Sequence, residues 1–569
     1  MYTHICGDFN DIANEISTTF QSELNITQVI DFPTYHHILA RPSMPDRICS
    51  DLNPFYSKAV QRPHLGGSLH TAVLWPPLPT LAPPPLTSTR THRPLKDSNI
   101  RAFGNWITHY QWDELDGLDD IQLIWDNYHS TITNAYQHFF PIETTTHHPC
   151  DAPWFTPRLR RLVARRNAAH SAKDLPLYRS LRNEVNREVL IAKKNHYPSK
   201  LAQLKNTNPS MWYSQIKKLA GLTKPSPPLP FLDSDPSVAA AALNSHFSAI
   251  CQTLPPLDHS SLPAYLPAPT PTPRVDELQI FNKLRLFKAN RSVTPLDIPA
   301  PLFKEFLIEL TKPLCVIVNA SLQSGKSPIQ WKDSFVTGIP KTLSPQSLGD
   351  LRPLSITIMG SLLCEGFVAD WIYEDIAHLI DPRQYGNVRG CSTTHGLIDF
   401  LDFAYKELEK RKTGVTATFI DFKKAFDLVD HTTIIKKCIS MGVRRCLIPW
   451  ISDFLTNRRQ AVRYQGSLSD FLPITCGVPQ GTKLGPLLFL ILMNDALIDT
   501  PHRMKYVDDC TITNSFDVES PDHSPTQTSL DALQHWTTVN HTQVNPTKTV
   551  TMTFAFSKPP PLPPCPYPS

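Results

Sequence analysis

Apolar and polar positions follow two different periods along the second half of the chain. Between about Val275 and Lys558, strand-like runs alternate with helix-like ones. The predicted strands are Val415–Ile420 (VTATFI), which is β-branched and apolar, and Met504–Val507 and Cys510–Thr513, which flank a turn. The predicted helices are Thr432–Ser440, Arg445–Leu455, Pro486–Leu492 and Asp531–Asn540. This mixture predicts an α+β fold with a partly antiparallel sheet over a buried helix.

Proline changes this picture, because it divides the chain. The 569 residues include 55 Pro, about twice the usual share, and only 20 Gly. Proline at this density is expected in linkers rather than in helices and central strands. Dense stretches lie at Pro76–Pro94, Pro225–Pro230, Pro255–Pro273 and Pro559–Pro568. The predicted parts are 1–75, a linker 76–100, a helical region 101–224, a linker 225–274, the main block 275–558 and a tail 559–569.

Charge is distributed unevenly over these parts. Trp154–Ala220 carries 15 Lys and Arg against three acids, so its net charge is +12, while the chain as a whole carries only +4. The run RLRRLVARRNAAH and the residues after it have helical periodicity. Such a run is either a solvated helix face or a surface for nucleic-acid phosphates, and the scarcity of acids favours phosphates.

The cysteine pattern and the length of the apolar runs indicate the cellular compartment. The 12 Cys are scattered without a CxxC pair, which is typical of free thiols in a reducing compartment. The longest apolar run, around Pro486–Met493, is far shorter than a membrane span. We therefore expect an intracellular protein, cytoplasmic or nuclear, that does not bind a membrane.

Three aspartates carry the candidate chemistry. Asp508 and Asp509 lie in a strand–turn–strand, where adjacent carboxylates need a compensating cation, although a solvated turn is the plain alternative. Asp421 ends the predicted strand VTATFI. Phosphoryl transfer to a hydroxyl needs two hard cations held by carboxylates, and strand-end aspartates suit that task. Asp427 and Asp430 are expected to stabilise a helix N-terminus instead.

The order of motifs resembles the reverse transcriptases of non-LTR retrotransposons (LINE, jockey-like). The strand-borne Asp421 within IDFKKAFDLVDH is followed by GVPQG at Gly477–Gly481, then by YVDD at Tyr506–Asp509, then by Asn545–Thr549. Earlier segments agree with the family as well: Asp297–Pro299, Trp331–Lys341, Leu351–Ser355 and Gln384–Thr394. The resemblance covers about half of the chain and implies the fingers and palm of a right-hand polymerase.

The resemblance implies a role for each matching position. Asp421, Asp508 and Asp509 would be catalytic and would hold two Mg²⁺ ions. Phe426 would lie under the deoxyribose, and Gln480 and Gly481 would line the incoming nucleotide. Arg352, Lys341 and Lys548 would contact the triphosphate or pyrophosphate. The implied partners are an RNA template, a DNA primer and dNTPs, and the basic region would grip RNA; the sequence does not predict the oligomeric state.

The first segment resembles the end of the endonuclease domain that precedes such polymerases. His4–Asn10 contains its GDFN motif, with Asp8 and Asn10, and His70 matches its final histidine. Leu69 stands where the family has the aspartate that orients this histidine, so we expect His70 to lack an orienting carboxylate. We therefore expect a truncated α/β-sandwich remnant without endonuclease activity. The run into PPPLPPCPYPS after Lys558 similarly predicts the absence of a full thumb, and hence weak or no polymerase activity.

Three functions follow as hypotheses. The favoured one is an RNA-directed DNA polymerase. The second is a non-enzymatic RNA-binding remnant of a transposable element that uses the basic helices. The third, an RNA-directed RNA polymerase, is disfavoured by Phe426 and by YVDD.

Overall fold

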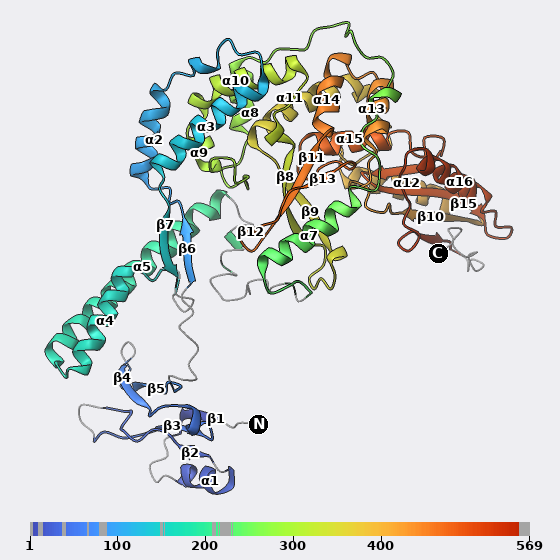
Figure 1. Ribbon diagram of the computed structural model, residues 1–569. Helices are drawn as coiled ribbons and strands as arrows, with labels where there is room; N and C mark the ends of the chain where they lie inside the picture. Colours follow the sequence, from blue (N-terminus) through green and yellow to red (C-terminus); the bar gives the residue numbers. More distant parts are fainter. Residues whose placement is uncertain are drawn as a thin grey trace. The chain divides into compact units, whose positions relative to one another are not determined.

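The structure, a computed structural model, describes most of the chain (Figure 1). The described residues are 4–9, 15–24, 26–36, 41–64, 68–78, 88–147, 152, 154–207, 212–213, 216, 229 and 231–556. Contacts divide the chain into two compact units. The smaller unit is Met1–Arg93 with Ile142–Ser226, and the larger one is Pro94–Pro141 with Pro227–Ser569.

The larger unit contains a four-stranded antiparallel sheet that carries two of the aspartates. Its strand order is β14-β15-β10-β16. The bounds are β10 Thr413–Ile420, β14 Arg503–Tyr506, β15 Asp509–Asp517 and β16 Val550–Phe554. A second sheet, ordered β12-β11-β8-β9 with β13 on β11, comprises β8 Asp333–Pro340, β9 Leu351–Ile356, β11 Arg458–Tyr464, β12 Ser467–Leu468 and β13 Leu472–Ile474.

Helices surround both sheets. They are α2 Asp97–His109, α3 Ile121–Phe139, α7 Pro236–Ile250, α8 Glu277–Arg285, α9 Ala300–Glu305, α10 Leu307–Ser324, α11 Met359–Ile376, α12 Thr393–Leu408, α13 His431–Ser440, α14 Ile448–Leu455, α15 Leu484–Met493 and α16 Ser524–Val539. In Figure 1, α12 and α16 lie beside β10 and β15, which they contact. All but one residue of α15 are buried, as its apolar sequence requires.

The predicted secondary structure of the main block is confirmed with small shifts. The buried strand is β10, and the two strands around the turn are β14 and β15. Arg445–Leu455 begins as a 3₁₀ turn, Arg445–Leu447, before α14. The last helix, α16, starts at Ser524 rather than Asp531, because Pro525 fits the first turn of a helix, where its missing N–H costs nothing.

The units divide the chain differently from the predicted linkers. Pro94–Pro141, predicted as the end of the first linker and the start of the helical region 101–224, packs in the larger unit. There Phe103 meets Phe306 and Trp125 meets Trp331 at ring distances of 5.2 and 5.4 Å. Part of the predicted linker 225–274 is the helix α7, which packs on β11. Its Pro236 occupies the first helical turn, so proline here starts a helix instead of interrupting one.

The smaller unit combines short sheets with a helical hairpin. Its elements are β1 His4–Asp8, α1 Glu15–Leu24, β2 Thr27–Gln28, β3 Asp46–Ser50, β4 Val60–His64, β5 Thr71–Leu74, β6 Ser88–His92, β7 Glu143–His147, α4 Pro157–Ser171 and α5 Leu175–Thr207. The hairpin α4–α5, predicted from helical periodicity, buries six apolar side chains: Leu159, Leu162, Ala169, Tyr178, Leu181 and Val185. Several of its basic residues are exposed, among them Arg161, Arg165 and Lys194. Among the described residues, no helix has the length and apolar character needed to cross a bilayer.

Candidate active site

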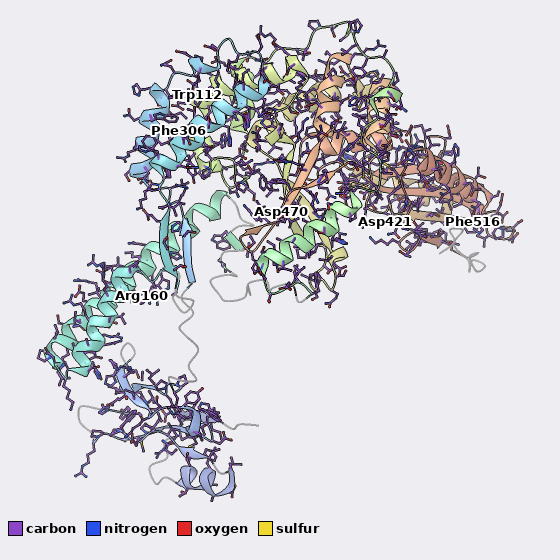
Figure 2. All side chains as sticks on the ribbon, viewed as in Figure 1. Trp112, Arg160, Phe306, Asp421, Asp470 and Phe516 are labelled. Atoms are coloured by element: carbon purple, nitrogen blue, oxygen red, sulfur yellow. The ribbon has the colours of Figure 1, made fainter. Side chains whose placement is uncertain are left out.

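The three aspartates converge at one end of the β10–β15 pair. Asp421 follows β10 directly (Figure 2), and Asp509 begins β15. Ile420 pairs with Cys510 in the antiparallel register. One residue further along the chain from Ile420 is Asp421, which therefore lies opposite Asp509, one residue before Cys510. Asp508 lies in the two-residue turn between β14 and β15. The predicted convergence of strand-end carboxylates is therefore present in the structure.

The turn itself is strained. Val507 has φ of +62°, a left-handed conformation that is rarely adopted by a β-branched residue and costs on the order of 1–3 kcal/mol. A buried side chain compensates: the Gln384 Oε1 accepts hydrogen bonds from the N–H of Val507 at 3.2 Å and from that of Gly386 at 3.0 Å. A Cβ on Gly386 would lie 2.4 Å from the Val507 nitrogen, so only glycine fits beneath this turn.

Electrostatics make this carboxylate cluster costly without a cation. Burial raises the pKa of Asp508, and the negative charge of Asp421 raises it further, against the lowering effect of Arg352 and Lys548. The pKa of Asp509 is raised by burial and then by Asp508 and Asp421. Crowded carboxylate oxygens are the ligand set that hard divalent cations prefer, so these residues fit a divalent metal site.

Asp421 is fixed by a residue for which the sequence suggested no role. The side-chain amide of Asn545 donates to Asp421 Oδ2 at 3.0 Å, and the Asn545 N–H donates to the Asp421 carbonyl at 2.7 Å. Lys548 reaches the same carboxylate, with Nζ 3.5 Å from Oδ2. Lys548 was a predicted site residue, and the Asn-Pro-Thr-Lys turn that carries both residues brings them to Asp421 together.

The predicted nucleotide residues Phe426, Gln480 and Gly481 lie on two segments, the turn after β10 and the GVPQG loop. Phe426 stacks on Phe489 with ring centroids 4.4 Å apart. The Gln480 carbonyl accepts from the Ser355 N–H on β9 at 2.7 Å. Gly481 has φ of +118°, and a Cβ there would lie 2.4 Å from the Ser355 carbonyl oxygen, so the loop approaches β9 only because this residue is glycine.

The three predicted cations are electrostatically coupled. Burial lowers the pKa of Lys341, and the charges of Lys548 and Arg352 lower it further. Arg352 lies on β9, and its charge also acts on Asp508. Two distant segments, the β8–β9 hairpin and the turn that carries Lys548, thus concentrate positive charge next to the carboxylates, where a polyphosphate would relieve their repulsion.

Sequence reasoning missed the buried polar residues that hold the site from behind. Glu365, on α11, is fully buried, and its carboxylate accepts from the N–H groups of Lys483 and Leu484 at 2.9 and 3.2 Å. It thereby caps the N-terminus of α15, the buried helix that follows the GVPQG loop. Glu365 is one of four acidic residues in α11, and its local sequence gives no signal of such a role.

Of the two further aspartates in the motif, one behaves as predicted. Asp430 is the N-cap of α13 and accepts from the Thr433 N–H at 2.9 Å. The same prediction for Asp427 is wrong, because this residue lies in a turn before the helix. Its carboxylate accepts a hydrogen bond from the side-chain amide of Gln480 at 3.2 Å. The chain needs only one cap, and Asp430 occupies that position.

In the smaller unit, one prediction about the endonuclease-like motif is wrong. His70 does have a carboxylate partner, because its Nδ1 lies 2.8 Å from Asp46 Oδ2, although Leu69 replaces the aspartate expected next to it. Asp46 starts β3, which pairs with β1, so it comes close to Asp8 at the end of β1. The His70 Nε2 is 4.0 Å from Asp8 Oδ2. Asn10 lies outside the described residues.

A basic groove runs along α8 and α11 of the larger unit and encloses about 650 Å³. Five basic residues and one acid, Asp370, contribute its charges; the basic residues are Lys283, Lys288, Arg291, Arg389 and Lys483. Asn387 and Arg389 connect the groove to the aspartate turn, because they follow Gly386 closely in sequence. Lys483, two residues after Gly481, connects it to the GVPQG loop.

Comparison with known proteins finds a family match for part of the chain. Residues 339–562 match the reverse transcriptase (RNA-dependent DNA polymerase) family. The RNA-directed DNA polymerase from mobile element jockey of Drosophila melanogaster is 28% identical over 254 residues, covering 42% of this chain and 28% of that protein. The polymerase from mobile element jockey of Drosophila funebris is 26% identical over 341 residues, covering 55% and 35%.

The chain thus spans about a third of the length of these relatives. Among solved structures, the apo telomerase from Candida tropicalis, truncated from its C-terminal domain, is similar with a TM-score of 0.30 and 13% identity. That match covers 45% of this chain and 62% of the telomerase chain.

Proposed function

Because the chain contains a reverse transcriptase domain of the kind found in jockey-like non-LTR retrotransposons, we propose that it is an RNA-directed DNA polymerase that extends a DNA primer on an RNA template. The observation that carries the proposal is the convergence of Asp421, Asp508 and Asp509 at one end of the β10–β15 pair. The three carboxylates repel one another, and the pKa values of Asp508 and Asp509 are raised. Both observations support a site that holds divalent cations.

Each residue around the aspartates has a task in this reaction. When bound, two Mg²⁺ ions would acidify the primer 3′-hydroxyl and balance charge on the leaving pyrophosphate. Arg352 and Lys341 would bind the triphosphate, and Lys548 would deliver a proton to the pyrophosphate. Phe426 would lie under the sugar and exclude a 2′-hydroxyl, with its ring held in place by Phe489.

The basic groove on α8 and α11 supplies a path for the template strand. Its five Lys and Arg side chains outnumber Asp370, which gives the groove a positive charge suited to a phosphate backbone. The groove leads to Lys483 and Arg389, which adjoin the GVPQG loop and the aspartate turn. A single strand bound there would arrive beside Gln480 and Gly481.

The function is tested by primer extension on poly(rA)/oligo(dT) with Mg²⁺, comparing dTTP with UTP. We expect incorporation of dTTP and strong discrimination against UTP. Absence of extension by the wild-type chain would remove the polymerase proposal, and equal use of UTP would remove the proposed role of Phe426.

A second candidate function, RNA binding without catalysis, rests on the basic hairpin α4–α5. We expect its exposed residues to bind single-stranded RNA through phosphates. Replacing Arg161, Arg165 and Lys194 by Gln should reduce the slope of log affinity against log salt concentration by about 2, at about 0.7 per phosphate contact. Filter binding of the full chain to a labelled RNA measures this slope.

The control for the RNA prediction is a triple Gln variant with the same loss of charge in the larger unit. Lys406, Lys410 and Lys412 suit it, because each already pairs with an acid of the chain, at 2.7 to 2.8 Å. An equal loss of slope in both variants would show that the hairpin is not the binding surface.

We also propose that the smaller unit has no endonuclease activity. The expected result is no nicking of supercoiled plasmid by the full chain in Mg²⁺. The dyad of Asp46 and His70 makes this a stringent test, because it supplies the histidine with a partner that the sequence did not suggest. Nicking that Asp8→Ala abolishes would contradict the proposal.

A further inference from the structure

Asp427 is a half-buried carboxylate next to the nucleotide site, and the proposed reaction assigns it no task. It follows Phe426 in the turn after β10, and its Oδ1 accepts a hydrogen bond from the Gln480 side-chain amide at 3.2 Å. Burial raises the pKa of Asp427, while the Gln480 hydrogen bond and the charges of Lys424 and Lys341 act in the opposite direction. Even partial removal of a carboxylate from water costs free energy, so its contact with Gln480 calls for an explanation.

The backbone around this contact is rigid. The turn after β10 and the GVPQG loop are joined by hydrogen bonds from the Val478 N–H to the Phe426 carbonyl and from the Gly477 N–H to the Val429 carbonyl, both at 2.8 Å. A Cβ on Gly477 would lie 2.7 Å from the Asp427 carbonyl oxygen, so the two segments touch. Little freedom therefore remains except in the side chains.

The Gln480 side chain is where that freedom matters. Its backbone carbonyl is bound to Ser355 on β9, the strand that carries Arg352. Its amide, free to rotate about several bonds, is held at the nitrogen end by Asp427. Fixing one end of an amide selects a rotamer before the nucleotide arrives, which removes an entropy cost from binding.

We propose that Asp427 is a positioning residue that orients the Gln480 amide for the incoming nucleotide, and this inference rests on the proposed polymerase function. Asp427 adjoins Phe426, so the same contact couples the residue under the sugar to the residue beside the base. The expected consequence is tighter binding of dNTP and better discrimination against ribonucleotides, with little effect on the chemical step.

The test uses single-nucleotide incorporation by the full chain, with KM and kcat measured separately for dTTP and UTP. Asp427→Ala should raise KM for dTTP about 10-fold, change kcat less than about 2-fold, and reduce the preference for dTTP over UTP. Asp427→Asn keeps an oxygen acceptor for the Gln480 amide and should stay within about 3-fold of wild type. Gln480→Ala should resemble Asp427→Ala.

A double-mutant cycle decides whether Asp427 acts through Gln480. In the Gln480→Ala background, Asp427→Ala should have no further effect on KM. Asp430→Ala is the matched structural control, since it removes the N-cap of α13 three residues away and should lower the melting temperature without changing KM.

Any of three results would overturn the inference. They are fully additive effects in the cycle, an Asp427→Asn variant as impaired as Asp427→Ala, and an unchanged KM in Asp427→Ala. Failure of the proposed function gives a different result, because the wild-type chain itself would then fail to extend the primer. That outcome would overturn the inference together with the function on which it rests.

Discussion

Replacing Asp508 by Asn is expected to abolish primer extension while making the metal-free protein more stable. Activity should fall by about 1,000-fold or more, because the site loses a negatively charged ligand for the divalent cations on which phosphoryl transfer depends. Stability should rise because Asp508 and Asp509 are held in a partly buried cluster with Asp421, whose charges oppose one another. The gain expected in EDTA is about 1 kcal/mol.

Two measurements check this pair of effects on the same preparation. Primer extension with Mg²⁺ gives the activity, and thermal unfolding with and without Mg²⁺ gives the stability. Wild-type protein should gain melting temperature on addition of Mg²⁺, since a cation that binds the folded state stabilises it. The Asp508→Asn variant should gain much less.

Asp517→Asn is the control for Asp508→Asn, because it makes the same change at the far end of β15, the strand that follows Asp508, where Asp517 is exposed. It should change activity less than about 2-fold. A fall in metal-free stability of Asp508→Asn would show that the carboxylate is held by favourable contacts and would contradict the cation site.

The local parts of this site could be predicted from the sequence. A β-branched run that ends in Asp421 and a short hairpin that contains Asp508 are patterns of neighbouring residues, and the period of a strand decides where their side chains lie. The turn in the GVPQG loop can be predicted from its own glycine residues in the same way. These features depend on residues that adjoin one another in the chain, so the structure reproduces them.

The residues that hold the site in place are of a different kind. Gln384 reaches Val507 across 123 positions, and Glu365 reaches Lys483 across 118. Each looks like an ordinary polar residue in its own segment, and only the tertiary fold reveals that it is buried and bonded. The boundaries of the compact units differ from the predicted linkers for a related reason. A proline in the first turn of a helix, such as Pro236 in α7, cannot be distinguished by sequence from a proline in a linker.

The second large effect is expected at such a long-range contact, the buried ion pair of Asp381 and Lys505. Lys505 is on β14, one residue before Tyr506, and its Nζ lies 2.7 Å from Asp381 Oδ2 with both side chains fully buried. The Lys505 Nζ also donates to the carbonyls of Met493, Asn494 and Ala496, at and just after the end of the buried helix α15. The pair thus fastens the aspartate hairpin to the core.

Asp381→Ala is expected to destabilise the larger unit by about 3–5 kcal/mol, because it leaves Lys505 buried without its counter-ion and removes the paired hydrogen bonds from Arg503 at 2.8 Å. Burial of Asp381 would raise its pKa, but the bonds from Arg503 and Lys505 hold that pKa below the usual value. The stabilisation should therefore be complete at neutral pH and be lost progressively as pH falls below about 4, where the unfolded chain takes up a proton at Asp381 before the folded chain does.

Denaturant unfolding of the full chain measures this loss, and Asp402→Ala is its matched control. Asp402 pairs with Lys406 at 2.7 Å, but on the exposed side of α12, where water screens both charges. Its removal should cost less than about 0.5 kcal/mol. If the two variants lost equal stability, the Asp381–Lys505 pair would not be the anchor of the hairpin. If Asp381→Ala unfolded early yet kept full primer extension at low temperature, the aspartate turn would hold its geometry without that anchor.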